Sequence, residues 1–416
     1  ITKDYYDSLM HRFTAKANDI LVSCSGVNYG AIYQLPIDSE IGVINQALLR
    51  IRLNNDIVDD KYFIYLFENL IVKRITGGTG DSTIPNFPPM NVVRKIPIEL
   101  PNIDIQQKIS KVLSDLDAKI ELNNKINADL EAMAKTLYDY WFVQFDFPNK
   151  DGRPYKSSGG KMVWSEKLKR EIPEGWEIGT ISDISELIRG VSYDKKSIKT
   201  SNDSNVIPIL RATNITGNQI DLNDMVYVPC ELVNEKQILN KFDILITMSS
   251  GSIDHIGKNG FYYFDETVSF GAFCAKFVPK QHYYFYLFNY AQSDFMSNTI
   301  KNECLGTNIN NLNSGMVNGF KLVIPDGDIL KLFNEKVEPL YQKISINYKE
   351  NQELASLRDW LLPMLMNGQV TVVDINESNN EKKKNVLKSI DIMKGFSSKE
   401  ENLGMVAEDK VEYKKG

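Results

Sequence analysis

An internal duplication with an offset of about 224 residues constrains this sequence more than any other feature. From residue 105 to residue 141, apolar residues recur at alternating steps of four and three, which is the period of a coiled coil. The second copy keeps this stripe, with one arginine in it. The two series are Ile109, Leu113, Leu116, Ile120, Leu130, Ala134, Leu137 and Trp141, and Phe333, Val337, Leu340, Ile344, Leu354, Arg358, Leu361 and Leu365.

Asparagines interrupt both stripes at matching core positions. Asn123 and Asn127 lie in the first, and Asn347 and Asn351 in the second. A buried asparagine costs stability but fixes the register and the choice of partner helix. The shared interruption therefore indicates that the two helices pair in one specified way.

The elements before each helix repeat as well. A short apolar strand ending in proline is predicted at 96–101 and again at 320–325. Further upstream, residues 19–26 match residues 243–251, and residues 62–67 match residues 283–288. A heptad-like stripe alone is typical of an ordinary packed helix, but the common offset, asparagines and flanking elements together indicate a duplication. Each copy is predicted to be a strand-rich part followed by one long helix.

The order of these parts predicts how the helices pair. The first helix leaves the first globular part toward the second, so paired seams require antiparallel helices with an approximate two-fold axis. About 37 residues per helix span roughly 55 Å, which is about one and a half turns of B-DNA. The predicted fold class is α+β, with two strand-rich domains separated by two long antiparallel helices that form a coiled coil.

Six segments follow from this reading. We expect a first domain at 1–101, a helix at 102–147, a linker at 148–171, a second domain at 172–325, a second helix at 326–373 and a charged, flexible tail at 374–416. Trp176, near the start of the second domain, has no counterpart in the first. The first domain is therefore expected to be truncated at its N-terminus.

Composition excludes several classes of protein. The net charge of −6 provides no overall attraction for phosphate, so nucleic-acid binding requires local basic surfaces or a charged partner. The four cysteines form no C-x-x-C pair, which argues against a zinc site or a disulfide framework. No apolar run is long enough to span a bilayer. We expect a soluble protein of the cytoplasm, with no membrane contact.

The sequence holds no recognisable catalytic pattern. It lacks a phosphate-binding P-loop, an H-E-x-x-H pair and a G-x-S-x-G elbow. His11, His255 and His282 lie far apart, so no metal site is expected, and no cofactor either. A non-enzymatic protein is therefore predicted. Two alternatives stay open: a coiled-coil adaptor that binds no DNA, which the net acidity favours, and a divergent methyltransferase or nuclease.

The ordered motifs resemble the specificity subunit of type I restriction-modification systems over residues 1 to about 373. They include Gly80 and Ser82, Gln106-Gln107, 116–120 and 137–142, and in the second copy 207–215 and 306–308. The resemblance implies two target-recognition domains that read the halves of a bipartite, asymmetric site in double-stranded DNA. It also implies that the helices set the gap and dock two methyltransferase subunits, with restriction subunits joining through the complex and all catalysis in the partners.

Two polar loops in each copy are the candidate DNA contacts, since base edges are read by side chains with donors and acceptors. Arg211 and Asn214 are added because the resemblance places them in a recognition segment. The alternative interpretation is that these polar residues only form the turns between strands. The candidates are Ser23, Ser25, Asn28, Tyr29, Lys73, Arg74, Thr79, Ser82, Thr83 and Asn86 in the first copy, and Arg211, Asn214, Ser249, Ser250, Ser252, Lys258, Thr307, Asn308, Asn310 and Asn311 in the second.

Three aromatic residues at the end of the first helix allow two interpretations. Tyr138, Trp141 and Phe142 could stack on bases or close the helix end as core or docking residues. We favour the second, because they continue the apolar stripe.

Overall fold

The computed structural model describes residues 10–25, 30–72, 90–307 and 311–372. The chain divides into two compact units, each built from segments far apart in sequence. One comprises Ile1–Asp117 and Ser356–Gly416, and the other comprises Ala118–Ala355. Both long helices cross the boundary between these units, so each unit holds a part of each helix.

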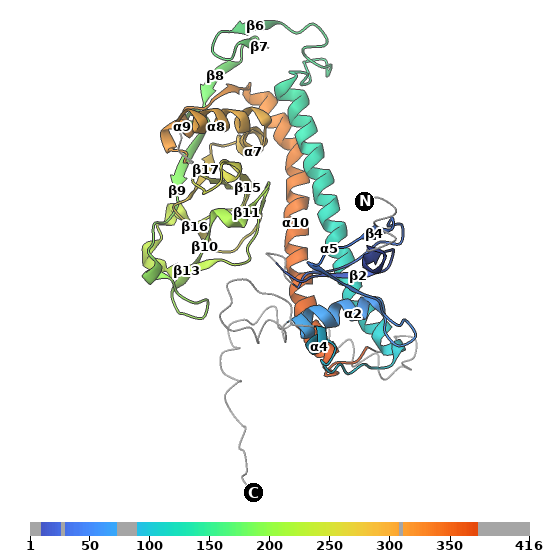
Figure 1. Cartoon of the computed structure of the whole chain (residues 1–416). Helices are drawn as coiled ribbons and strands as arrows, with labels where there is room; N and C mark the ends of the chain where they lie inside the picture. The colour runs from blue at the N-terminus through green and yellow to red at the C-terminus, as the bar shows by residue number, and fades with distance from the viewer. Residues whose placement is uncertain (1–9, 26–29, 73–89, 308–310, 373–416) are drawn as a thin grey trace, which may run out of the picture. The chain divides into compact units, whose positions relative to one another are not determined.

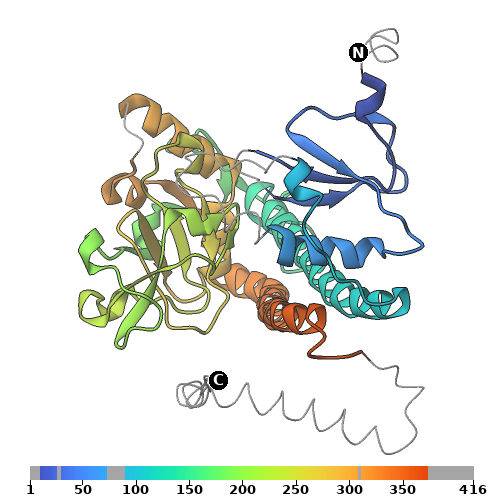
Figure 2. The same cartoon turned by 60° about the horizontal axis from the view of Figure 1, so that its bottom comes forward.

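The first unit contains a small antiparallel sheet of order β3-β2-β5, formed by Ile32–Gln34, Ile20–Ser23 and Leu48–Ile51. Ile20 and Val22 of the central strand are buried against Phe63 and Phe67. The remaining elements, some of which Figure 2 shows in blue, are η2 (His11–Phe13), β1 (Thr14–Ala15) paired with β4 (Gly42–Val43), α2 (Asp60–Leu66), the π-helix η3 (Phe67–Val72) and α4 (Met90–Val93).

The same unit holds the start of helix α5 (Ile103–Tyr138) and the end of helix α10 (Gly327–Met366). Tyr62 and Leu66 of α2 form one buried cluster with Ile109, Leu113 and Leu365 of these helices. Gln106, which is fully buried, donates to the carbonyls of Ile57 and Pro101 and accepts from the backbone of Asp59. The buried apolar cluster and the hydrogen bonds of the Gln106 side chain therefore attach the globular part to the helix pair.

The second unit is larger and contains most of the strands. A four-stranded antiparallel sheet has the order β15-β14-β17-β9 and a three-stranded mixed sheet has the order β13-β10-β16. The strands are β9 (Ser185–Arg189), β10 (Val206–Leu210), β13 (Val226–Pro229), β14 (Ile244–Thr247), β15 (Asn259–Phe261), β16 (Ser269–Phe270) and β17 (Cys274–Pro279).

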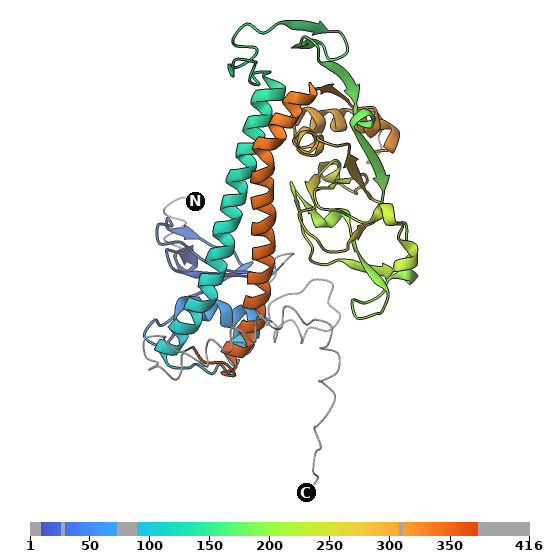
Figure 3. The same ribbon diagram turned by 180° about the vertical axis from the view of Figure 1, so that it is seen from behind.

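Smaller pairs and helices complete this unit. The strand pairs are β6 (Met162–Ser165) with β7 (Arg170–Pro173), β8 (Glu177–Thr180) with β18 (Lys321–Ile324), and β11 (Ile215–Thr216) with β12 (Gln219–Ile220). The helices are α6 (Ile181–Ile184), α7 (Tyr284–Ala291), α8 (Asp294–Thr307) and α9 (Ser314–Asn318), with 3₁₀ turns at 195–197, 212–214, 230–232, 235–237 and 253–255. Figure 3 shows α10 beside this unit's strands and helices.

Helices α5 and α10 run side by side and antiparallel (Figure 1). In the second unit Trp141, in the π-helix η4 (Asp139–Val143) that continues α5, packs on Phe333, and Asn123 meets Asn351. In the first unit Arg358 forms a 2.8 Å ion pair with Asp117. Each step forward along α5 is thus matched by a step backward along α10, which confirms the predicted antiparallel pairing and the mixed α+β fold.

The predicted seam positions face inward. The buried seam residues are Ile109, Leu113, Ala134, Trp141, Phe333, Val337, Ile344 and Leu365, together with Asn123, Asn127 and Asn347. Arg358 occupies a seam position without being apolar, because its guanidinium reaches the carboxylate of Asp117. The other predicted seam residues, Leu116, Ile120, Leu130, Leu137, Leu340, Asn351, Leu354 and Leu361, are half-buried.

The duplication is visible in matched contacts as well as in matched elements. Tyr65 of α2 donates to Asp117 of α5, and Asn289 of α7 donates to the hydroxyl of Tyr341 of α10, at 2.9 Å. Both members of the second pair lie about 224 residues beyond those of the first. This corrects the sequence match of Tyr62 with Tyr283: Tyr62 corresponds to Tyr286, one helical turn later. Helical periodicity makes such a slip hard to see in sequence.

One predicted strand is wrong. Residues 321–324 form β18 by pairing with β8, but residues 96–101 have no strand partner among the described residues. A strand needs a neighbour to satisfy its backbone groups.

Candidate nucleic-acid interface

The four-stranded sheet of the second unit presents one end at which polar and exposed residues gather. Strand β14 finishes at Thr247 opposite Cys274, where β17 begins, and Arg189 at the end of β9 pairs with Ala275. Asn259, at the start of β15, pairs with Ile246. The connections just outside these strand ends therefore lie at a common edge, which we call the recognition end of the second unit: Arg189, Ser249–Lys258 and Gly271–Phe273.

The three-stranded sheet contributes to the same place. Its parallel strands β10 and β16 end together, since Leu210 pairs with Phe270, and they continue into Arg211 and Gly271. A side-chain carbon on Gly190 would lie 2.2 Å from the carbonyl oxygen of Gly271. Glycine at this position lets the two sheets approach closely, and it places Arg189 and Arg211 near one edge.

The two loops predicted in the second copy meet. Ser249 forms an isolated antiparallel bridge with Asn311, and the backbone amide of Leu312 donates to the carbonyl of Met248 at 2.7 Å. Asn311 and Ser252 are exposed, while Ser249 and Ser250 are half-buried. Thr307 is the last residue of α8. Asn308 and Asn310 lie outside the described residues. Loops more than fifty residues apart in sequence therefore form one surface.

Arg211 and Asn214 form hydrogen bonds and an ion pair within the second unit. The Asn214 amide is buried, donates to the carbonyls of Asp221 and Asn223, and accepts from the backbone of Arg211. These bonds give Asn214 a turn-forming role, and its predicted contact with DNA stays a prediction. Arg211 is partly exposed and pairs with Asp224 at 2.7 Å. It stays a candidate for phosphate.

A cavity of about 590 Å³ opens beside the recognition end. Lys258 lines it together with Lys135 of α5 and Lys301 of α8. The Lys258 ammonium lies 3.3 Å from Nδ1 of His255. Sequence reasoning missed Lys301, Lys135 and Arg189, because only the folded chain brings them near the predicted loops.

Glu131 of α5 lies at the same cavity. Its carboxylate accepts a hydrogen bond from Asn218, in the turn between β11 and β12, while its other oxygen is buried without a partner. Burial raises the pKa of Glu131 to about 7, against the lowering effect of the Asn218 bond. Its contact ties the second unit's strands to α5.

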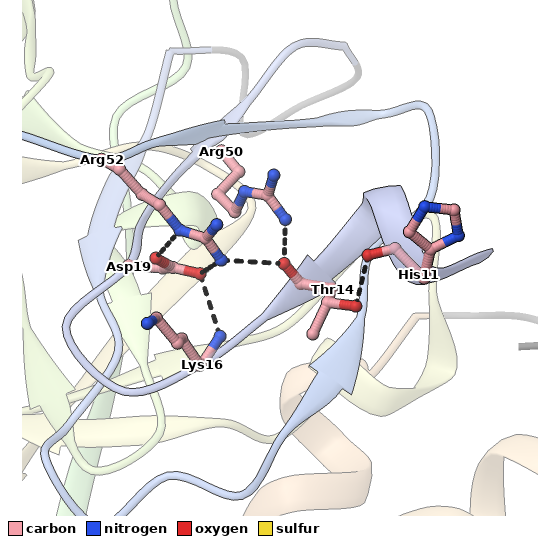
Figure 4. Close-up of polar contacts among 6 residues, drawn as sticks. All are labelled: His11, Thr14, Lys16, Asp19, Arg50 and Arg52. Carbon is pink, nitrogen blue, oxygen red and sulfur yellow. Dashed lines mark hydrogen bonds and ion pairs between the residues drawn. The ribbon is translucent and has the colours of Figure 1, made fainter. Parts of the chain in front are cut away.

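Each unit contains a buried aspartate that forms an ion pair, and the duplication relates these two aspartates, Asp19 and Asp243. Asp19 pairs with Arg52 at 2.6 Å and accepts from the backbone of Lys16 at 2.9 Å (Figure 4). In the second unit Asp243 pairs with Lys276 at 2.7 Å and accepts from the backbone of Asn240 at 2.9 Å. The strand registers differ, however, since Ile20 pairs with Ile51 and Ile244 with Phe277.

Two of the DNA contacts predicted in the first copy lie within the described residues. Ser23 ends β2 and donates to the carbonyl of Ser25, and both residues are half-buried. Asn28, Tyr29, Lys73, Arg74, Thr79, Ser82, Thr83 and Asn86 lie outside the described residues. The described part adds basic residues that sequence reasoning missed: Figure 4 shows Lys16, Arg50 and Arg52 together, with Arg50 donating to the carbonyl of Thr14.

The aromatic residues at the end of α5 are core residues. Tyr138, Trp141 and Phe142 are buried, and their rings pack on Phe333 and Tyr286. They close the second unit's core at the helix end and expose no face on which a base could stack.

The described residues show neither a metal-binding cluster nor a membrane-spanning helix. No group of three or more His, Cys, Asp or Glu side chains there is arranged to hold a metal ion. Within the same part of the chain, no helix has the length and apolar character needed to cross a membrane.

Comparison with known proteins gives one answer. The model of the type I restriction modification DNA specificity domain matches residues 9–132 and 173–356. The MjaIX specificity subunit of Methanocaldococcus jannaschii is 28% identical over 370 residues, which are 88% of this chain and 80% of that protein. The EcoKI specificity subunit of Escherichia coli is 31% identical over 206 residues, 48% of this chain and 44% of that protein.

A solved structure is similar as well. The S subunit of a type I restriction-modification system from M. genitalium aligns with a TM-score of 0.47 at 18% identity, over 85% of this chain and 84% of that one. The family match covers well over half of this chain, so the chain belongs to the specificity subunits of type I restriction-modification systems. It is the DNA specificity subunit of such a system, which is the non-catalytic subunit.

Proposed function

We propose that this chain reads a bipartite, asymmetric DNA site through two diverged modules related by the duplication. The observation that carries the proposal is the pair of asparagine contacts in the seam, Asn123 with Asn351 and Asn347 with Asn127, which the duplication exchanges. An approximate two-fold axis in a protein suits the two-fold relation between the half-sites of a duplex. Because the modules have diverged, the half-sites would differ.

The recognition end of the second unit supports base reading by that module. Ser249, Ser250, Ser252 and Asn311 offer donors and acceptors of the kind that contact base edges. Lys258, Lys301 and Arg189 add positive charge suited to phosphate. Ser23 and Ser25, with the predicted loops outside the described residues, would serve the first module.

The helix pair would act as the ruler. Helix α5 has 36 residues and α10 has 40, which at 1.5 Å per residue correspond to about 54 and 60 Å. Lengths of this order exceed one turn of B-DNA. The gap between half-sites would therefore follow from helix length.

The outer faces of the same helices suit protein partners. Leu122 and Met133 of α5 and Ile346 of α10 are all more than half exposed. Two methyltransferase subunits would dock there, with restriction subunits joining through the complex. These partners would supply catalysis and much of the positive charge that an acidic chain lacks. A cytoplasmic location belongs to the same proposal.

The test is the methylation pattern of DNA exposed to the chain reconstituted with the methyltransferase subunits of its own system. The proposal expects methylation confined to one motif with two specified parts and a constant gap. It also expects no methylation by the chain alone. Methylation without a motif would indicate an adaptor, and methylation by the isolated chain would indicate an enzyme; either result would refute the proposal.

A further inference from the structure

Phe273 is a large apolar side chain that stands in solvent at the recognition end. It lies in the connection between β16 and β17, and its side chain is 67% exposed. Of the ring contacts between described residues, none includes Phe273. Its neighbours in sequence, Phe270 and Cys274, are by contrast fully buried. The fold thus excludes this ring from the core while burying the residues around it.

The backbone that carries the ring is firmly held. The carbonyl of Phe273 accepts from the amides of Met248 at 2.8 Å and Ser249 at 3.1 Å. The amide of Ala272 donates to Val191 at 2.8 Å, and its carbonyl accepts from Arg189 at 2.8 Å. The ring therefore projects from a braced loop, so little conformational entropy would be lost when it meets a ligand.

The surroundings of Phe273 favour nucleic acid over protein as the ligand. Ser249 adjoins its carbonyl and bridges to Asn311, and Arg189 binds the preceding residue. Protein interfaces bury aromatic anchors among apolar neighbours. An exposed aromatic ring carried by a loop that adjoins serine, asparagine and arginine residues suits DNA, where apolar side chains touch thymine methyl groups or wedge against base faces.

The two modules differ at this point. In the first unit the amide of Cys24 donates to the carbonyl of Ala47 at 2.8 Å, in the same place in the fold as the bond from Met248 to Phe273. Alanine therefore stands where the second module exposes a phenyl ring. A difference in an exposed side chain on matching backbone is the kind that would make half-sites differ.

We propose that Phe273 packs its ring against a base of the half-site read by the second module and contributes to the choice of that base. The proposal rests on the DNA interface proposed above. The shared chemistry is an apolar base surface, either a thymine methyl group or an exposed base face.

The experiment measures DNA binding by the chain reconstituted with its methyltransferase subunits. The variants are Phe273→Ala and Phe273→Leu, with Phe295→Ala as matched control, since Phe295 is 55% exposed on α8. We expect Phe273→Ala to weaken cognate binding about tenfold or more, as removing a stacked aromatic does. Binding of unrelated duplex and the salt dependence of affinity should be unchanged, and Phe295→Ala should bind as the parent does.

Two DNA substitutions identify the base contact. Replacing thymine by uracil at the sensitive position should weaken binding by the parent but not by Phe273→Ala if the ring meets a methyl group. If the ring meets a base face, 2-aminopurine there should change its fluorescence on binding by the parent, and Phe273→Leu should lose that change. The predicted loss of affinity with uracil, or the predicted change in 2-aminopurine fluorescence, supports the proposal. If neither is observed, the proposal is overturned.

Lysine variants distinguish a failure of the Phe273 proposal from a failure of the proposed DNA interface. Lys258→Ala and Lys301→Ala should each reduce the slope of log affinity against log salt by about 0.9. If they do while Phe273→Ala binds cognate DNA normally, Phe273 is not a base contact and the interface stands. If neither lysine variant alters the slope and Phe273→Ala has no effect, the interface fails as well. Loss of complex assembly in Phe273→Ala would place a protein partner on the ring and overturn the proposal.

Discussion

The side-chain amide of Asn123 donates a 2.9 Å hydrogen bond to the side-chain oxygen of Asn351 across the helix pair. The duplication maps this contact onto the one from Asn347 to Asn127, at 2.7 Å. One helix thus donates in the first pair and the other helix donates in the second. Antiparallel helices related by an approximate two-fold axis require this exchange.

The Asn347 contact should act as a matched pair in stability measurements. Asn347→Leu leaves the buried Asn127 oxygen without its donor, and the expected loss in free energy of unfolding is about 1–3 kcal/mol. The double replacement Asn127→Leu with Asn347→Leu should recover that loss, since an apolar seam packs well. Denaturant unfolding of the four proteins gives the coupling. Additive losses in the double variant would show that the two amides do not interact.

The two duplicated ion pairs should differ in strength. Asp243 and Lys276 are both almost fully buried, whereas Arg52, the partner of Asp19, is 47% exposed. Asp243→Asn should therefore cost about 3–5 kcal/mol of unfolding free energy because it leaves a buried charge uncompensated. Asp19→Asn should cost about 1 kcal/mol or less. Equal losses in denaturant unfolding would contradict this reading of burial.

Glu131 should make the stability of the chain depend on pH. Burial raises its pKa from 4.5 to about 7, so the folded state holds this proton more tightly than the unfolded state. Stability should therefore fall as pH rises from about 4.5 to about 7 and level off above that. Other charged groups line the same cavity: Lys135, Lys258 and Asp254. The Glu131 charge also interacts with three tyrosine hydroxyls and raises their pKa values: those of Tyr263, Tyr341 and Tyr348.

The measurement is thermal unfolding of the parent and of Glu131→Gln between pH 5 and 8. The glutamine keeps an acceptor for Asn218 but cannot ionise, so the variant should gain stability relative to the parent as pH rises through this window. Glu121→Gln is the control, because Glu121 is exposed on the same helix. Parallel curves for the parent and Glu131→Gln would show that Glu131 ionises as freely in the folded chain as in the unfolded one.

The duplication made the helix pair predictable, because the apolar stripe and the elements before it recur at one offset. The sequence also showed that Asn123 and Asn127 repeat as Asn347 and Asn351. The recognition end was only partly predictable: Ser249 and Asn311 were candidates, but nothing in the sequence shows that they meet. Arg189 and Phe273 were missed because strand pairing, which is non-local, brings them there. The hydrogen bonds of Asn214 were not predictable, because they depend on carbonyls supplied by a later turn.

The central claim is that the helix pair fixes the gap between half-sites, and lengthening both helices tests it most directly. A heptad inserted between Glu121 and Leu122 of α5, with another between Gln352 and Glu353 of α10, keeps the seam in phase and leaves both asparagine pairs intact. Seven residues add about 10 Å, roughly three base pairs of B-DNA. Methylation mapping with the reconstituted complex should return the same two half-sites with a gap about three base pairs longer. An unchanged gap with unchanged half-sites would contradict the claim.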